Sequence, residues 1–143
     1  MSIRTVTHLN FKGQARAALA FYHSVFEGEG QQVLVTYAQA GQADSAEDPE
    51  HIVWGQVTGE DGIALMAYDV PVGASWDPGD NAFFVSLRGD DPETVRRLWE
   101  RLKEGASVLH TLAPSQWAPL YGMLRDRFGA TWVVDVSVPY SPA

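Results

Sequence analysis

One pattern of strands and a helix occurs twice within the 143 residues of the chain. The segment "FKG" at 11–13 returns as "LRG" at 87–89, 76 residues later, and "IALMAYDV" at 63–70 resembles "TWVVDVSV" at 131–138, 68 residues on. The apolar helical positions that align at the first displacement are Leu19 with Val95, Tyr22 with Leu98 and Phe26 with Leu102. Self-similarity of this kind predicts two copies of one supersecondary unit.

Each copy is predicted to contain a strand, a helix and three more strands. Alternating β-branched residues indicate the strands, and apolar residues spaced three and four apart indicate the helices. In the second helix Asp91 is the expected N-cap and Pro92 the first helical residue. The predicted ranges are strands at 5–11, 32–38, 51–58 and 62–70 with a helix at 14–26, then strands at 82–88, 107–113, 121–126 and 130–138 with a helix at 89–105.

The fold class that follows is α+β, with two βαβββ modules. We expect a single domain over 1–143 that consists of modules 1–74 and 75–143. Neither module is long enough to bury both faces of its sheet, so the sheets, expected to be antiparallel, should form one open, barrel-like cleft with the helices outside.

Composition excludes several classes of function. The formal net charge of −8, from eighteen acidic and ten basic residues, argues against nucleic acid as a partner. The chain has no cysteine, which excludes disulfides, thiolate catalysis and cysteine-bound metal. No signal-peptide pattern is present and no segment approaches the ~20 apolar residues of a membrane span, so the expected location is the cytoplasm, without membrane contact.

The most distinctive segment is "QWAPLYGMLRDRFGATWVV" at 116–134. It predicts the closing hairpin of the second module, with its turn at Asp126–Gly129. Glycine at 129 permits a positive φ, and the Asp126 carboxylate can accept backbone N–H bonds inside the turn.

This segment, together with "AALAFYHSVFEGE" and "LMAYDVP", resembles the vicinal oxygen chelate superfamily of glyoxalase I, bleomycin-resistance proteins and extradiol dioxygenases. Within that superfamily it is similar to the PhnB-like branch, which carries a 3-demethylubiquinone-9 3-methyltransferase-like domain name. The resemblance covers nearly the whole chain and implies a homodimer. We do not expect methyl transfer, because no glycine-rich nucleotide loop follows the first strand.

The resemblance also implies where a metal would be held in metal-dependent members, namely on the first and one later strand of each half. His8 matches such a position, and the neutral Gln56 stands where a glutamate is expected. The second half offers Asn81 or Ala82, and Val133 with Asp135 two residues further on. One imidazole and one amide are a poor ligand set for a divalent ion, so we expect no metal cofactor.

The resemblance therefore implies a metal-free pocket for a small molecule, for which we select His8, Gln56, Trp117 and Tyr121. Other interpretations stay open: His8 as a hydrogen-bonded histidine of a half-buried strand, and the tryptophans as core or dimer-interface residues. The function favoured is that of an antibiotic- or metabolite-binding protein without enzymatic activity. A metal-dependent lyase, isomerase or dioxygenase, and a structural or regulatory dimer with a vestigial pocket, are the alternatives.

Overall fold

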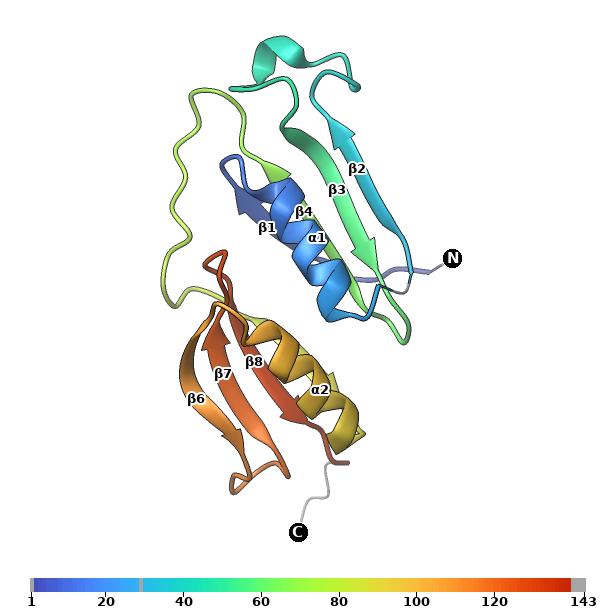
Figure 1. Ribbon diagram of the computed structural model, residues 1–143, viewed down its shortest axis with the longest axis vertical. Helices are drawn as coiled ribbons and strands as arrows, with labels where there is room; N and C mark the ends of the chain where they lie inside the picture. Colours follow the sequence, from blue (N-terminus) through green and yellow to red (C-terminus); the bar gives the residue numbers. More distant parts are fainter. Residues whose placement is uncertain (1, 29, 140–143) are drawn as a thin grey trace. The chain divides into compact units, whose positions relative to one another are not determined.

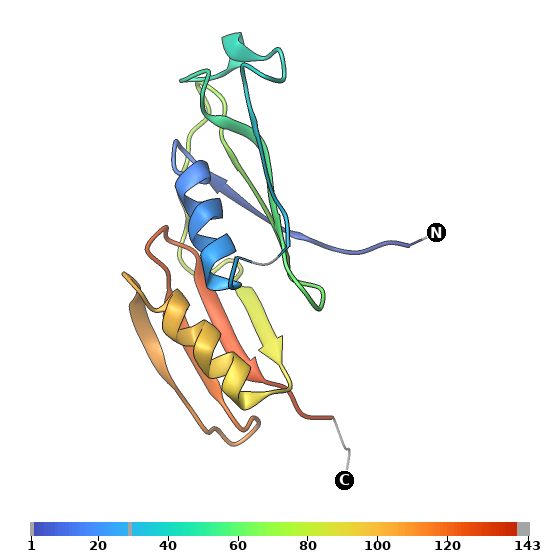
Figure 2. The same cartoon turned by 45° about the vertical axis from the view of Figure 1, so that its right-hand side comes forward.

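A computed structural model describes residues 2–28 and 30–139 and divides the chain into two compact units, Met1–Pro78 and Gly79–Ala143. Each unit contains one four-stranded sheet and one long helix that lies across one face of that sheet (Figure 1). Figure 2 shows the first sheet nearly edge-on, with the helix on one side only. The other face of each sheet is the open face.

The first unit contains a short 3-10 turn besides its helix and four strands. Its strands are hydrogen-bonded in the order β1-β4-β3-β2. The elements are β1 (Thr7–Phe11), α1 (Ala15–Val25), β2 (Gln32–Thr36), η1 (Ala43–Ser45), β3 (Ile52–Thr58) and β4 (Ala64–Asp69).

The second unit repeats this order without the 3-10 turn. Its strands are hydrogen-bonded as β5-β8-β7-β6. The elements are β5 (Val85–Gly89), α2 (Pro92–Leu102), β6 (Ser107–Ala113), β7 (Tyr121–Arg125) and β8 (Thr131–Val136). The α+β class with two βαβββ modules is therefore confirmed.

The expectation of antiparallel sheets was wrong, because each sheet is mixed. β1 pairs in parallel with β4, and β5 pairs in parallel with β8. The helical crossover sends the first and second strands in the same direction, and two antiparallel steps then return the fourth strand to that direction. The fourth strand consequently fits beside the first.

The displacement of 68 residues that the sequence suggested between β4 and β8 was also wrong. It differs by an odd number of residues from a displacement that matches the helix-facing residues of the two strands. The residues of β4 that face α1 are Leu65, Ala67 and Asp69, whereas those of β8 that face α2 are Trp132, Val134 and Val136. A displacement of 68 would pair a helix-facing residue with one on the open face, since a shift of one residue reverses every side chain of a strand.

The two cores lie between each helix and its sheet. The predicted stripe of α2 is confirmed, because Val95, Leu98, Trp99 and Leu102 are all buried. The Asp91 side chain caps α2 as predicted by accepting a hydrogen bond from the Glu93 N–H. In the first core Gly55 allows α1 to pack closely on β3, because a Cβ at this position would clash with Leu19 Cδ1.

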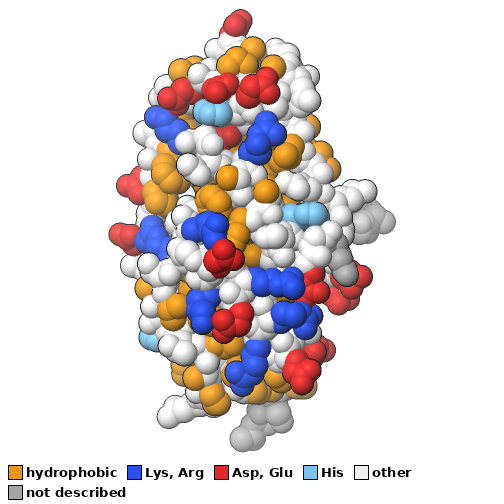
Figure 3. Space-filling model, in the orientation of Figure 1, with side chains coloured by type: hydrophobic (Ala, Val, Ile, Leu, Met, Phe, Trp, Pro, Cys, Tyr) orange, Lys and Arg blue, Asp and Glu red, His pale blue; other side chains and the backbone are white. Residues whose placement is uncertain are grey.

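The surface of the second unit over α2 is charged. Figure 3 shows Lys and Arg side chains interleaved with Asp and Glu side chains over the region of α2. Within residues 2–28 and 30–139, no helix has both the length and the apolar character that crossing a membrane requires.

Candidate functional site

The open face of the first sheet carries a row of four side chains, one from each strand. His8 of β1 pairs with Met66 of β4, Met66 pairs with Gln56 of β3, and Gln56 pairs with Val33 of β2. Residues directly opposite each other on neighbouring strands point to the same face. The row therefore places His8 and Gln56 on one surface, on the side of the sheet away from α1.

A second row lies two residues further along the same face. Asn10 pairs with Tyr68, and Trp54 pairs with Val35. Trp54 is 40% exposed, whereas Tyr68 is half-buried. The two rows together combine aromatic, aliphatic and amide side chains around one histidine.

His8 makes two contacts that define its orientation. Its Nδ1 lies 3.0 Å from Asn10 Oδ1, and its ring meets the Tyr68 ring edge-on, with centroids 5.3 Å apart. With the Asn10 amide placed so that its oxygen faces the ring, the neutral tautomer of His8 that forms this hydrogen bond carries its proton on Nδ1. The Nε2 atom of the exposed His8 ring is then an acceptor.

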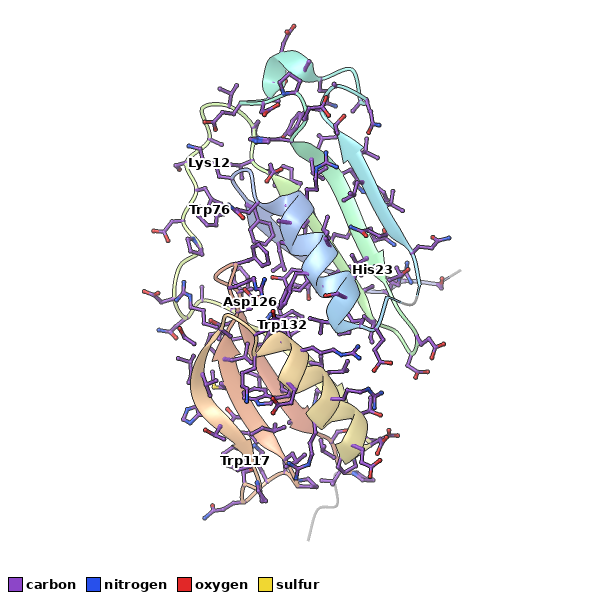
Figure 4. All side chains as sticks on the ribbon, viewed as in Figure 1. Lys12, His23, Trp76, Trp117, Asp126 and Trp132 are labelled. Carbon is purple, nitrogen blue, oxygen red and sulfur yellow. The ribbon has the colours of Figure 1, made fainter. Side chains whose placement is uncertain are left out.

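The open face of the second sheet carries aromatic and charged side chains in one row across neighbouring strands. Tyr121 contacts the Trp117 ring edge-on at 5.1 Å and lies 6.3 Å from the His110 ring. Trp117 itself is 64% exposed in the segment between β6 and β7 (Figure 4). Asp135, which pairs with Tyr121 across the strands, accepts a hydrogen bond of 3.0 Å from the Arg88 Nε.

The residues considered as metal ligands in the second half do not form a ligand set. Asn81 and Ala82 both precede β5, so the prediction of a strand that begins at residue 82 was wrong. The Arg125 guanidinium explains this, since it donates to the Gly79 carbonyl and the Asp80 carboxylate and holds the connector outside the sheet. Val133 lies on the open face, and Asp135 is already paired with Arg88.

His8 and Gln56 are not direct neighbours in their row. Met66 stands between them, so their backbones are two strand spacings, about 9.6 Å, apart. In the part of the chain that the structure describes, no three His, Asp or Glu residues are grouped so that they could hold a metal ion.

Two buried aspartates of the distinctive sequence segments have structural roles. Asp69, 1% exposed at the end of β4, accepts N–H bonds from Gly13, Ala15 and Ile52 at 2.7, 3.0 and 2.9 Å. The α1 helix has no side-chain cap from its own N-cap residue, Gln14, so Asp69 replaces that cap from another strand.

Asp126 holds the β7–β8 turn of the second unit, as predicted. Its carboxylate accepts from the N–H groups of Phe128 and Ala130 at 2.8 and 3.1 Å, and from Trp132 Nε1 at 2.9 Å. Figure 4 shows Asp126 beside Trp132. Gly129 has the expected positive φ, 93°. Trp132 is 1% exposed, so it is a core residue rather than part of an open face.

Tyr37 reinforces the hydrogen bonds around Asp69. Its hydroxyl donates to the Asp69 carbonyl oxygen at 2.6 Å. Burial, followed by the nearby charges of Tyr68 and Asp69, raises the pKa of Tyr37 above its ordinary value. The phenol therefore stays protonated to a higher pH in the folded chain than in the unfolded one.

The four selected pocket residues fall into two pairs. His8 and Gln56 share the open face of the first sheet, while Trp117 and Tyr121 touch each other on the second. Sequence reasoning missed Asn10, Met66 and Tyr68. The alternation in "ALMAYD" contains the signal for the last two, but only the pairing with β1 reveals which face they share with His8.

These sheets and their pairing order define the glyoxalase/bleomycin resistance/dioxygenase type of fold, and the chain matches a more particular family. The sequence model of 3-demethylubiquinone-9 3-methyltransferase matches residues 3–135. The chain thus belongs to the 3-demethylubiquinone-9 3-methyltransferase family, and the resemblance to this PhnB-like branch that was inferred from its sequence is confirmed. A search of curated proteins gives no match.

Solved structures agree with this assignment. Protein PA1353 from Pseudomonas aeruginosa is 29% identical, with a TM-score of 0.82 over 95% of this chain and 98% of that chain. The PhnB protein from Bacillus cereus is 20% identical, with a TM-score of 0.70 over 94% and 100%. A glyoxylase/bleomycin resistance protein/dioxygenase domain from Frankia sp. EAN1pec is 11% identical, with a TM-score of 0.65 over 96% and 99%, and shares the fold.

Proposed function

We propose that the protein binds a small organic molecule on its open sheet faces, without a metal ion. The observation that supports this most is the first open face, where the His8 imidazole and the Gln56 amide stand among Trp54, Tyr68 and Met66. A few polar groups on a largely apolar surface are typical of organic-ligand sites, in which they orient the ligand while the apolar side chains cover it.

The chemistry of the donors argues for binding rather than metal-assisted catalysis. A hard or borderline divalent ion requires several anionic or imidazole ligands, and His8 with the neutral Gln56 supplies one. The acids in the family-typical segments, Asp69 and Asp126, each accept three hydrogen bonds within the fold. They are therefore poor candidates for a general acid or base.

The family's name suggests methyl transfer, but the first helix is a poor cofactor site. The segment between β1 and α1 is three residues long, Lys12 to Gln14. A cofactor carboxylate or phosphate would need the free N–H groups of a helix N-terminus. Those of Gly13 and Ala15 are bonded to Asp69 instead.

The test is a ligand screen on chelator-treated protein, read by tryptophan fluorescence, followed by titration of variants. Trp117→Ala removes an exposed aromatic face of the second unit, and we expect a ligand bound on that unit's open face to lose about 1–3 kcal/mol, roughly 5- to 150-fold in Kd. His8→Ala should weaken a ligand bound on the open face of the first sheet. His23→Ala is the matched control, because His23 belongs to α1, on the opposite side of the first sheet.

Two outcomes would contradict the proposal. One is that no organic compound binds the metal-free protein. The other is that a ligand binds with the same Kd to wild type, His8→Ala and Trp117→Ala, which would put the site elsewhere.

A further inference from the structure

We infer that the ligand of the first open face is an uncharged, planar aromatic compound with a hydroxyl or N–H group that donates to His8 Nε2. This inference rests on the proposed function and specifies its ligand class. It follows from the charge of the face, from the arrangement of its rings and from the orientation of His8.

The face is uncharged although its unit is strongly acidic. Residues 1–78 contain three Lys or Arg and ten Asp or Glu. None of these lies among the strand residues of the open face, which are His8, Asn10, Val33, Val35, Trp54, Gln56, Thr58, Ala64, Met66 and Tyr68. Asp69, the acid within β4, points to the helix side and bonds to backbone N–H groups there.

A charged ligand would consequently be desolvated on this face without an ionic partner. An anion would find no Lys or Arg on these strands and would also face the negative charge of the unit. A cation would find aromatic rings, which attract it, but no carboxylate to replace its water. A neutral compound has neither cost.

The rings favour a planar compound. Tyr68 and Trp54 each stand two residues beyond the Met66–Gln56 pair, on adjacent strands, and His8 contacts Tyr68 edge-on. Met66 and the two valines of β2 complete the surface between and beside them. A flat aromatic molecule contacts such a surface over more of its area than a globular one does.

The polar group of the ligand must be a donor at His8. With the Asn10 amide oxygen facing Nδ1, the neutral tautomer carries its proton on Nδ1, and Nε2 is the acceptor. Gln56, two strands away in the same row, has both a donor and an acceptor. The Gln56 amide can therefore bind a second polar group of the ligand, whether that group is a donor or an acceptor. The preference for a ligand with a donor group consequently depends on His8.

Four naphthalenes of similar size separate these features: 2-naphthol, 2-methoxynaphthalene, 2-naphthoate and 2-naphthyltrimethylammonium. Isothermal titration at pH 7.5 should show 2-naphthol binding about 3- to 10-fold tighter than its methyl ether, the value of one neutral hydrogen bond. Both ions should bind more weakly than the ether.

Variants assign these differences to residues. His8→Ala should abolish the preference for 2-naphthol over the ether and leave the ether's Kd unchanged, whereas the control His23→Ala should keep the preference. Trp54→Ala should weaken 2-naphthol and the ether by the same factor.

The inference is overturned if an ion binds best, or if the preference for 2-naphthol survives in His8→Ala. It is also overturned, with the proposed function intact, if none of the four binds while another compound binds metal-free wild type and not His8→Ala. If no compound of any class binds, the proposed function fails together with the inference.

Discussion

Replacing Asp69 by asparagine tests the structural role assigned to the buried acids of the family segments. In the native chain Oδ1 accepts from Gly13 and Ala15, and Oδ2 accepts from Ile52. The asparagine amide keeps one oxygen, which can serve the first two donors. Its NH₂ group then faces the Ile52 N–H, so two donors meet in a buried site.

The magnitude follows from these contacts. A buried donor left without an acceptor costs about 1–3 kcal/mol, and loss of the negative charge at the N-terminus of α1 adds ~1–2 kcal/mol. We expect Asp69→Asn to lower the free energy of unfolding by about 2–5 kcal/mol, a large part of the ~5–15 kcal/mol typical of a domain. With a urea slope of about 2 kcal/mol per molar, the midpoint should fall by ~1–2.5 M.

The assay is urea unfolding followed by far-ultraviolet circular dichroism. Asp44→Asn is the matched control, because Asp44 is exposed in η1, and its midpoint should stay within the equivalent of ~0.5 kcal/mol. An Asp69→Asn midpoint equal to that of wild type would show that Asp69 does not hold α1 and β3 as described.

Further predictions concern both units. Asp126→Asn leaves buried donors around the β7–β8 turn and should lower unfolding stability by about 1–3 kcal/mol in the same urea assay; an unchanged midpoint would refute the turn's role. Because the pKa of Tyr37 is raised, its contribution to stability is complete below the ordinary value of 10.0 and is lost as the pH rises through the higher folded value. Tyr37→Phe should therefore lose less stability than wild type in urea titrations between pH 9 and 11, and equal losses would contradict this. Gly55→Ala would bring a methyl group against Leu19 and should lower the free energy of unfolding by about 1–3 kcal/mol, measured as a lower Tm. An unchanged Tm would disprove this prediction. Strand β6 is an uncharged edge strand and Leu109 on it is 52% exposed, so we propose that a homodimer forms along this edge. Light scattering should give a mass of about twice 15.7 kDa for wild type and about 15.7 kDa for Leu109→Lys. Equal masses for the two proteins would exclude this edge as the dimer interface.

Local patterns in the sequence were enough to predict the order of elements. The helical stripe from Val95 to Leu102 and the turn at Asp126 depend on residues within a few positions of one another, so periodicity and turn chemistry reveal them. The parallel pairing of β1 with β4 joins residues about 58 positions apart, such as His8 and Met66, and no local pattern encodes it.

The candidate site illustrates the same limit. His8 and Gln56 could be selected individually, but their common face depends on the Met66 register between them. The tautomer of His8 depends on Asn10, whose side chain gave no signal in the sequence. The role of Asp69 as a cap for α1 was likewise hidden, because its partners Gly13 and Ala15 are more than fifty residues away.

Binding without metal is the central claim, and an equilibrium titration of chelator-treated protein tests it most directly. The metal content of the sample is measured by mass spectrometry, and the tightest ligand from the screen is titrated with and without one equivalent of Zn²⁺ or Ni²⁺. The account predicts far less than one metal ion per chain and the same Kd in all three titrations. A stoichiometric metal ion that survives purification, or binding that occurs only after Zn²⁺ or Ni²⁺ is added, would contradict it.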